Sequence, residues 1–318
     1  MCKPMLPLKA GDEETGTAAM KDVSYDKSFA PSLNFLELSD LFDLSKPWVL
    51  VENGSYQGYF DNVPAAFRVG PWKLACRLYL VVAVAWVLFE CIQCYLHPPT
   101  VPETDYHSTY GTNTWQWWYN ATGFAWTLYI AYKSLKTPMG WSAGLSYTLQ
   151  SWTLITLRHG LSALAPFVPE LAVINEHLRF PMLLQTAITF LVWNFILFPA
   201  IAITMKNPNR KRDFYKFNFG FLLSQLHMAN LPLAFINGVW GTPARELNQM
   251  DFCMALAMML QYLALYLFVL DRLGVHFYFV FSPRTPLALF SWTAFIGFQF
   301  AGFAMWKLAI LKYGGVVA

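Results

Sequence analysis

The sequence predicts an all-α protein, a bundle of six or seven helices that cross a membrane. Its 318 residues are 56% hydrophobic and only 13% charged. A soluble protein has roughly 25% charged residues, so this chain has too few to cover the surface of a soluble globule. The net charge of +3 is small and its basic residues lie at the ends of apolar segments, so we expect the lipid bilayer as a partner and no nucleic acid.

Seven apolar segments approach or exceed the length of about 20 residues that a membrane-spanning helix needs. The stretch 275–286 is expected to be a turn, and six spans remain if it instead extends a neighbouring helix. The seven candidate spans are 72–96, 115–135, 145–167, 180–205, 217–237, 252–270 and 287–311.

The first 70 residues differ from the rest in being rich in charged and polar residues. We expect residues 1–70 to form a cytosolic segment, in which 33–44 is a short amphipathic helix on the membrane surface. Residues 71–318 then form the transmembrane helical domain.

The loops that follow the second and fourth candidate spans hold most of the basic residues, whereas the loops after the first, third and fifth hold almost none. Because basic loops face the cytosol, this alternation predicts a cytosolic N-terminus in a multi-pass protein of an endomembrane or the plasma membrane. Two basic residues near the C-terminus fit seven spans less well and keep six spans as an alternative. The loop residues are Lys133, Lys136, Lys206, Arg210, Lys211, Arg212 and Lys216, and the C-terminal pair is Lys307 and Lys312.

The third, fourth and fifth spans carry more polar residues than a lipid-facing helix needs, and we expect them to enclose a polar cavity. Polar groups in a bilayer cost free energy unless they are paired, and Ser and Thr there usually bond helix backbones. The fifth span brings His227 to membrane depth together with a proline, Pro232.

Missing motifs exclude several classes of enzyme. The chain has no HExxH, no P-loop, no GxGxxG and no two histidines within four residues, so we predict no metal and no cofactor. A haem held by His159 and His227 stays an alternative. A hydroxyl nucleophile activated by a histidine base is the remaining chemistry, with the hydroxyl on the third span and His227 on the fifth.

Four short segments carry a resemblance to a known family. They are SYTLQSWTL at 146–154, the helix at 180–201, QLHMANLPLAFIN at 225–237 and YLFVLDRLGVHFYFVFSP at 266–283. These resemble the androgen-induced-gene family of polytopic membrane hydrolases over about residues 140–283. The resemblance implies cleavage of fatty acid esters of hydroxy fatty acids, with Thr148 as nucleophile and His227 as base.

The match departs from the family pattern at three points. Met228 stands where the family has Thr, Asn237 where it has an acidic residue, and Tyr147 and Thr148 are contiguous. A shifted alignment makes Thr153 the nucleophile instead.

Further residues are expected to bind the lipid ester substrate. Gln225 and Asn230 are candidates to stabilise an oxyanion, together with Gln150 and Asn194. Arg158 and His159 are expected to hold the fatty carboxylate, by charge complementarity. The competing interpretations are a non-catalytic membrane subunit or scaffold, and a small-molecule transporter.

Overall fold

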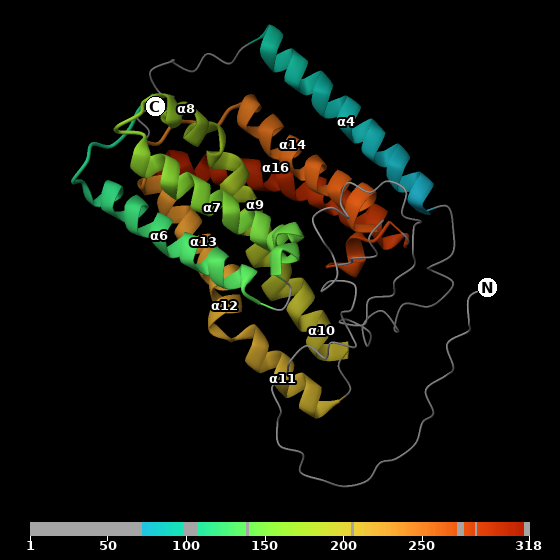
Figure 1. Cartoon of the computed structure of the whole chain (residues 1–318). Helices are drawn as coiled ribbons and strands as arrows, with labels where there is room; N and C mark the ends of the chain where they lie inside the picture. The colour runs from blue at the N-terminus through green and yellow to red at the C-terminus, as the bar shows by residue number, and fades with distance from the viewer. Residues whose placement is uncertain are drawn as a thin grey trace, which may run out of the picture.

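The computed structural model describes residues 72–97, 107–137, 140–204, 207–271, 277–283 and 285–314. All regular structure in these ranges is helical (Figure 1). The N-terminal segment 1–70, with its expected helix at 33–44, lies outside the described residues.

The predicted apolar segments are helices, several of them interrupted by π-helical turns. The first three correspond to α4 (Trp72–Leu96), α6 (Trp115–Leu135) and α7 (Tyr147–Leu164). The fourth comprises α9 (Arg179–Leu191), η4 (Val192–Leu197) and α10 (Phe198–Thr204). The fifth comprises α12 (Phe221–Ser224), η5 (Gln225–Ala229), α13 (Asn230–Phe235) and η6 (Ile236–Trp240). The last two are α14 (Gln249–Leu265), continued by η7 (Tyr266–Leu270), and α16 (Leu287–Tyr313).

The length and composition of these helices indicate a multi-pass membrane protein. Among the described residues, four helices are long and apolar enough to cross a bilayer. A fifth is added if Lys211–Asn218 and Phe221–Trp240, which meet at a bend of 57°, cross together. The four are Trp72–Leu96, Glu170–Ile203, Gln249–Leu270 and Leu287–Tyr313.

Two segments that the sequence predicts as loops are helical instead. The segment 168–179 contains α8 (Glu170–His177), with an acid in its first turn and a histidine in its last. Both side chains complement the helix dipole. The basic loop contains α11 (Pro208–Asn218), which starts with proline, a residue suited to a first helical turn because it lacks an N–H. In the turn region, η8 (Phe279–Phe281) is a single 3-10 turn and does not extend a neighbouring helix.

Helix α9 forms the centre of the bundle. Every residue from Arg179 to Thr189 is buried, and α9 packs against α7, α13, α14 and α16. Helix α4 lies at the outer edge (Figure 1), with exposed apolar residues such as Leu78, Val82 and Phe89. An apolar outer face is what a lipid-contacting helix requires.

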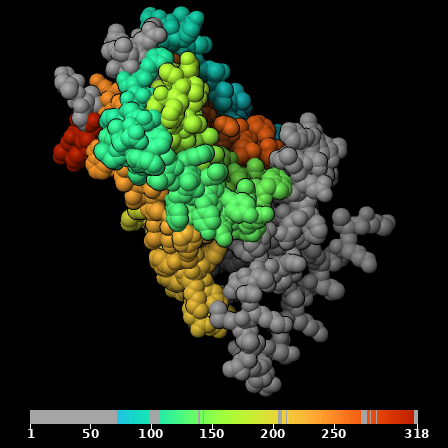
Figure 2. Space-filling model, turned by 60° about the vertical axis from the view of Figure 1, so that its left-hand side comes forward, coloured from blue at the N-terminus to red at the C-terminus, as the bar shows by residue number. Residues whose placement is uncertain are grey.

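One end of the bundle carries a basic helix. Helices α11 and α12 project from one end, drawn in gold in Figure 2, and α8 lies at the opposite end in Figure 1. Helix α11 carries Lys211, Arg212 and Lys216, so one end of the bundle is basic.

Candidate functional site

Thr148 lies in the first turn of α7, where the helix leaves backbone N–H groups unpaired. Ser146 caps this helix, and its side chain accepts a hydrogen bond from the Leu149 N–H at 3.2 Å. The Thr148 N–H is one of the unpaired donors of a helix start, and it donates to the Tyr278 hydroxyl at 3.4 Å. The bonds to Ser146 and Tyr278 therefore fix the backbone of this first turn, and the Thr148 side chain faces the bundle interior.

The Thr148 hydroxyl contacts His227, as the resemblance predicts. Thr148 Oγ1 lies 3.2 Å from His227 Nε2, and both side chains are buried. The same oxygen lies 3.1 Å from the hydroxyl of Tyr278. A hydroxyl, an imidazole and a phenol thus meet at one oxygen atom.

One arrangement of protons gives each donor in this cluster an acceptor. The Thr148 N–H donates to the Tyr278 oxygen, the Tyr278 O–H donates to Thr148 Oγ1, and the Thr148 O–H donates to His227 Nε2. In this arrangement Nε2 is unprotonated. An unprotonated imidazole nitrogen that accepts from a hydroxyl is positioned as a general base.

A π-helical turn and an aromatic stack hold the His227 ring. His227 lies in η5, and π-turns inside helices occur frequently at functional sites. The Trp193 ring stacks on it, with centroids 4.2 Å apart and planes 17° apart, and Trp193 is itself fixed by an Nε1 hydrogen bond to Asn218 at 2.7 Å. No side chain among the described residues hydrogen-bonds to Nδ1, and the ring is held by the Trp193 stack and by a backbone contact with Leu223, where a catalytic triad has a carboxylate.

Pro232 determines how the His227 carbonyl is satisfied. In a π-turn, the His227 carbonyl would accept from the N–H five residues later, but residue 232 is a proline and has no N–H. The N–H four residues later, that of Leu231, is bonded to the Asn230 side chain at 2.8 Å. The carbonyl instead accepts from Asn194 Nδ2 at 2.8 Å. Asn194 Nδ2 also donates to the Phe190 carbonyl at 2.8 Å, so both of its protons are used.

Tyr278 was not predicted from the sequence, because it lies in a stretch expected to be a turn. Tyr266 fixes its backbone, donating to the Tyr278 carbonyl at 2.7 Å and accepting from the Tyr278 N–H at 3.2 Å. Burial raises the pKa of Tyr278, although hydrogen bonds from the first turn of α7 partly lower it. Its hydroxyl is therefore protonated at neutral pH and can donate.

The cluster lies in the wall of an apolar pocket. The empty space of this pocket, part of it open to the outside, is about 280 Å³, and Thr148 and Tyr278 are among the residues that line it. Most of the others are aliphatic or aromatic: Tyr147, Ile188, Thr189, Val192, Trp193, Leu197, Phe281 and Phe295. Such a lining suits a hydrocarbon chain beside the reactive hydroxyl.

The alternative nucleophile, Thr153, faces away from this site. It is exposed, and its hydroxyl donates to the Leu149 carbonyl at 2.8 Å. Gln225 accepts from Trp126 Nε1 at 3.2 Å, and Asn230 Nδ2 is 3.4 Å from the Thr186 carbonyl. Both lie on the same stretch as His227, but no hydrogen bond joins either of them to Thr148.

Arg158 and His159 belong to a separate polar network. Arg158 is ten residues beyond Thr148 on α7, about 15 Å along the helix axis. His159 Nδ1 lies 3.0 Å from Asn120 Oδ1, which also accepts from Asn237 Nδ2 at 2.7 Å. Binding of a substrate carboxylate by Arg158 or His159 stays a prediction. The haem alternative also stays a prediction, and its two histidines have different hydrogen-bond partners, Asn120 for His159 and Thr148 for His227.

Lys307 has an acidic partner that the sequence did not reveal. Its Nζ lies 2.6 Å from Glu246 Oε1, and both side chains are partly exposed. Within the described ranges, no group of three His, Cys, Asp or Glu residues could hold a metal ion.

Comparison with known proteins gives no match: no family model, no curated protein and no solved structure is similar to this chain.

Proposed function

We propose that the protein is a membrane hydrolase that cleaves fatty acyl esters, with Thr148 as nucleophile and His227 as base. The observation that carries the proposal is the contact of 3.2 Å between Thr148 Oγ1 and His227 Nε2 beside an apolar pocket of about 280 Å³. The resemblance to the androgen-induced-gene family suggests the same pair and an ester of a hydroxy fatty acid as substrate.

In the first half of the reaction, the ester's acyl chain occupies the apolar pocket. Thr148 Oγ1 attacks the ester carbonyl while His227 Nε2 takes the hydroxyl proton. His227 returns this proton to the leaving alcohol, and an acyl-threonine ester remains. In the second half, His227 takes a proton from water while the water oxygen attacks the acyl carbonyl. The bond from the acyl carbon to Thr148 Oγ1 then breaks, His227 returns the proton to Oγ1, and the free acid leaves.

Tyr278 is our first candidate for stabilising the oxyanion. In the proton arrangement given above, its O–H donates to Thr148 Oγ1 before the reaction and turns to the carbonyl oxygen as Oγ1 forms the new ester bond. Gln225 and Asn230 are second candidates, because both flank His227 and carry amide N–H groups.

We further propose seven spans with a cytosolic N-terminus, which puts α11 and the end of α6 on the cytosolic side. Thr148 is in the first turn of α7, which follows the cytosolic end of α6. His227 is three residues after α12, which follows the cytosolic helix α11. Both residues then lie near the cytosolic ends of their spans, in the cytosolic half of the bilayer. Water and the polar product would exchange with the cytosol.

Turnover of p-nitrophenyl palmitate by purified full-length protein in detergent tests the hydrolase proposal. Thr148→Ala and His227→Ala are expected to lower kcat by at least about 10³-fold, because they remove members of one catalytic unit. Thr153→Ala, on the same helix but facing outward, is the matched control and keeps wild-type kcat.

Wild-type turnover in Thr148→Ala would contradict the proposed role of this residue. A folded wild type that hydrolyses neither palmitate nor shorter acyl esters would favour the non-catalytic scaffold instead.

A further inference from the structure

Two thiols from distant parts of the sequence touch at the end of the bundle opposite α11 (Figure 1). Cys94 lies near the end of α4 and Cys253 near the start of α14, and their Sγ atoms are 3.9 Å apart. Their side chains are 5% and 0% exposed, so neither thiol faces lipid. A third thiol, that of the partly exposed Cys91, also contacts Cys253. A disulfide bond is about 2.0 Å long, so a movement of about 1 Å by each sulfur would join α4 to α14.

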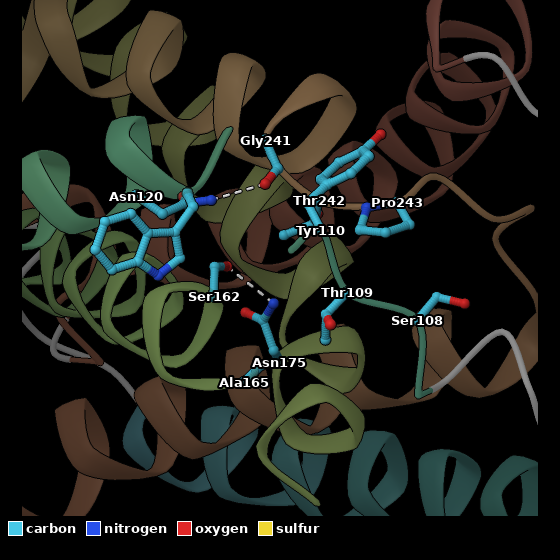
Figure 3. Close-up of a pocket in the computed structure, with 11 residues that line it drawn as sticks. Ser108, Thr109, Tyr110, Asn120, Ser162, Ala165, Asn175, Gly241, Thr242 and Pro243 are labelled. Carbon is cyan, nitrogen blue, oxygen red and sulfur yellow. Dashed lines mark hydrogen bonds between the residues drawn. The ribbon is translucent and has the colours of Figure 1, made fainter. Parts of the chain in front are cut away.

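Buried polar contacts join other helices at this end of the bundle. Glu176 Oε1 of α8 lies 2.6 Å from Arg179 Nη2 of α9 and 3.8 Å from Arg158 Nη2 of α7. These contacts connect α7, α8 and α9, and further hydrogen bonds add α6 and the residue after η6. Figure 3 shows two of them, from Asn175 to Ser162 and from Asn120 to the carbonyl of Gly241.

Helix α4 is joined to α14 at this end by a weaker polar contact. Gln249 Nε2 donates to Glu90 Oε2 at 3.3 Å, and this bond is exposed to solvent. Such a bond adds little stability, because water offers the same groups equivalent partners. Cys94 and Cys253 lie one helical turn further along each helix. A covalent bond between these residues, 159 positions apart, would restrict the unfolded chain and hold the outer helix against the bundle.

The proposed topology puts both thiols on the non-cytosolic side of the membrane. With a cytosolic N-terminus, α4 ends and α14 begins on that side. Cys94 is two residues before the end of α4 and Cys253 four residues after the start of α14, so both lie close to the aqueous boundary. Disulfides form and persist in the compartments that this side faces, the lumen of the endoplasmic reticulum and the cell exterior.

We propose that Cys94 and Cys253 are joined by a disulfide bond that fixes α4 to α14. The oxidant is a small disulfide of that compartment, such as glutathione disulfide, and it reacts while the chain folds, before α4 covers Cys253. The proposal rests on the proposed topology and is independent of hydrolase activity.

The bond forms by two successive thiol–disulfide exchanges. The Cys94 thiolate attacks one sulfur of glutathione disulfide, which gives a mixed disulfide and one glutathione thiol. The Cys253 thiolate then attacks the Cys94 sulfur, which forms the Cys94–Cys253 bond and releases the second glutathione thiol. Two electrons pass from the cysteines to the oxidant, and the two cysteine protons end on the two glutathione thiols.

Peptide mass spectrometry of the full-length protein tests this bond. Cells that express the protein are dissolved in sodium dodecyl sulfate with N-ethylmaleimide, which caps every free thiol, and the protein is digested without reduction. We expect two of the five cysteines to be uncapped, in a pair of peptides linked through Cys94 and Cys253 that dithiothreitol separates. Cys76, also buried but about 27 Å away along α4, is the internal control and is capped.

Cys91→Ser is the matched variant, because Cys91 is on the same helix and contacts the same thiol, and it is expected to keep the linked peptides. Cys253→Ser is expected to leave Cys94 capped. Capped Cys94 and Cys253 in the wild type would overturn the proposal, as would a bond from Cys91 to either of them. A glycosylation acceptor tag at either end of the chain, in the same cells, shows whether the topology or only the pairing was wrong.

Discussion

At the scale of single residues, Tyr278 changes how the Thr148 hydroxyl can react. A Thr–His pair alone has a base but no group to stabilise the negative charge on a carbonyl oxygen. Tyr278 lies 3.1 Å from Thr148 Oγ1, its backbone N–H and carbonyl are both bonded to the Tyr266 hydroxyl, and it carries a proton at neutral pH. In the proposed reaction it is the donor that turns to the carbonyl oxygen.

Tyr278→Phe removes this donor and keeps the ring. We expect kcat for p-nitrophenyl palmitate to fall by about 10²-fold, the usual cost of losing one oxyanion donor, with KM almost unchanged. Tyr262→Phe is the control, since the buried Tyr262 hydroxyl has no hydrogen-bond partner among the described residues. Equal kcat values for the two variants would contradict the role assigned to Tyr278.

The sequence predicted two of the three residues in this cluster. Thr148 and His227 could be found because short motifs mark them and because a histidine at membrane depth is unusual. Tyr278 lies in the segment 266–283 that also carries the resemblance, but it was given no role, since the base and the nucleophile were sought on the third and fifth spans. The ion pair between Lys307 and Glu246 was also missed, because their contact depends on how the segment before α14 packs against α16.

At the scale of secondary-structure elements, the π-turns shape the site. Turn η5 contains His227 and η4 contains both Trp193, which stacks on its ring, and Asn194, which binds its carbonyl. Such turns cannot be read from hydropathy, because they leave the apolar pattern of a span unchanged. The prolines Pro199 and Pro232 were sequence signals of disturbed helices in the fourth and fifth spans, and the missing N–H of Pro232 explains why Asn194 is needed.

Asn194→Leu leaves the buried His227 carbonyl without a donor. We expect it to lower the free energy of unfolding by about 1–3 kcal/mol. In a Pro232→Ala background, the new N–H can bond this carbonyl, so the cost of Asn194→Leu is expected to be smaller by about 1 kcal/mol. Denaturant titration in detergent of the wild type, both single variants and the double variant measures this coupling, and strictly additive costs would rule it out.

Two glycines in α16 offer a matched test of how this helix packs on α9. A Cβ at Gly302 would overlap Leu184 Cδ1, whereas a Cβ at Gly297 meets nothing within 4 Å. We expect Gly302→Ala to lower the free energy of unfolding by about 1–3 kcal/mol through overpacking. Gly297→Ala is expected to be neutral or to stabilise the helix by up to about 1 kcal/mol. Thermal unfolding followed by tryptophan fluorescence compares them, and the opposite order would contradict this packing.

At the scale of the whole molecule, hydropathy predicted the positions of the long helices but not what joins them. The ends of α4 and α6 match the predicted segments, because each segment stops where polar residues begin. Helices α8 and α11 were expected to be loops, since their polar composition hides a helical pattern. The Arg158–Glu176 network was missed for the same reason, because Glu176 and Arg179 fell in or beside a predicted loop.

The number of spans decides on which side the C-terminus lies. Seven spans and a cytosolic N-terminus put residue 318 on the non-cytosolic side, so a glycosylation acceptor tag fused after Ala318 is expected to be modified in cells. The same tag fused before Met1 is the control and stays unmodified. A modified N-terminal tag, or an unmodified C-terminal tag, would contradict the proposed topology.

Covalent labelling tests most directly whether His227 activates the Thr148 hydroxyl. Purified protein in detergent is treated with a fluorophosphonate, digested and examined by peptide mass spectrometry. We expect one adduct, on Thr148, that is absent in His227→Ala and retained in Thr153→Ala. Absence of an adduct in folded wild type, or an adduct on Thr153 in its place, would contradict the claim.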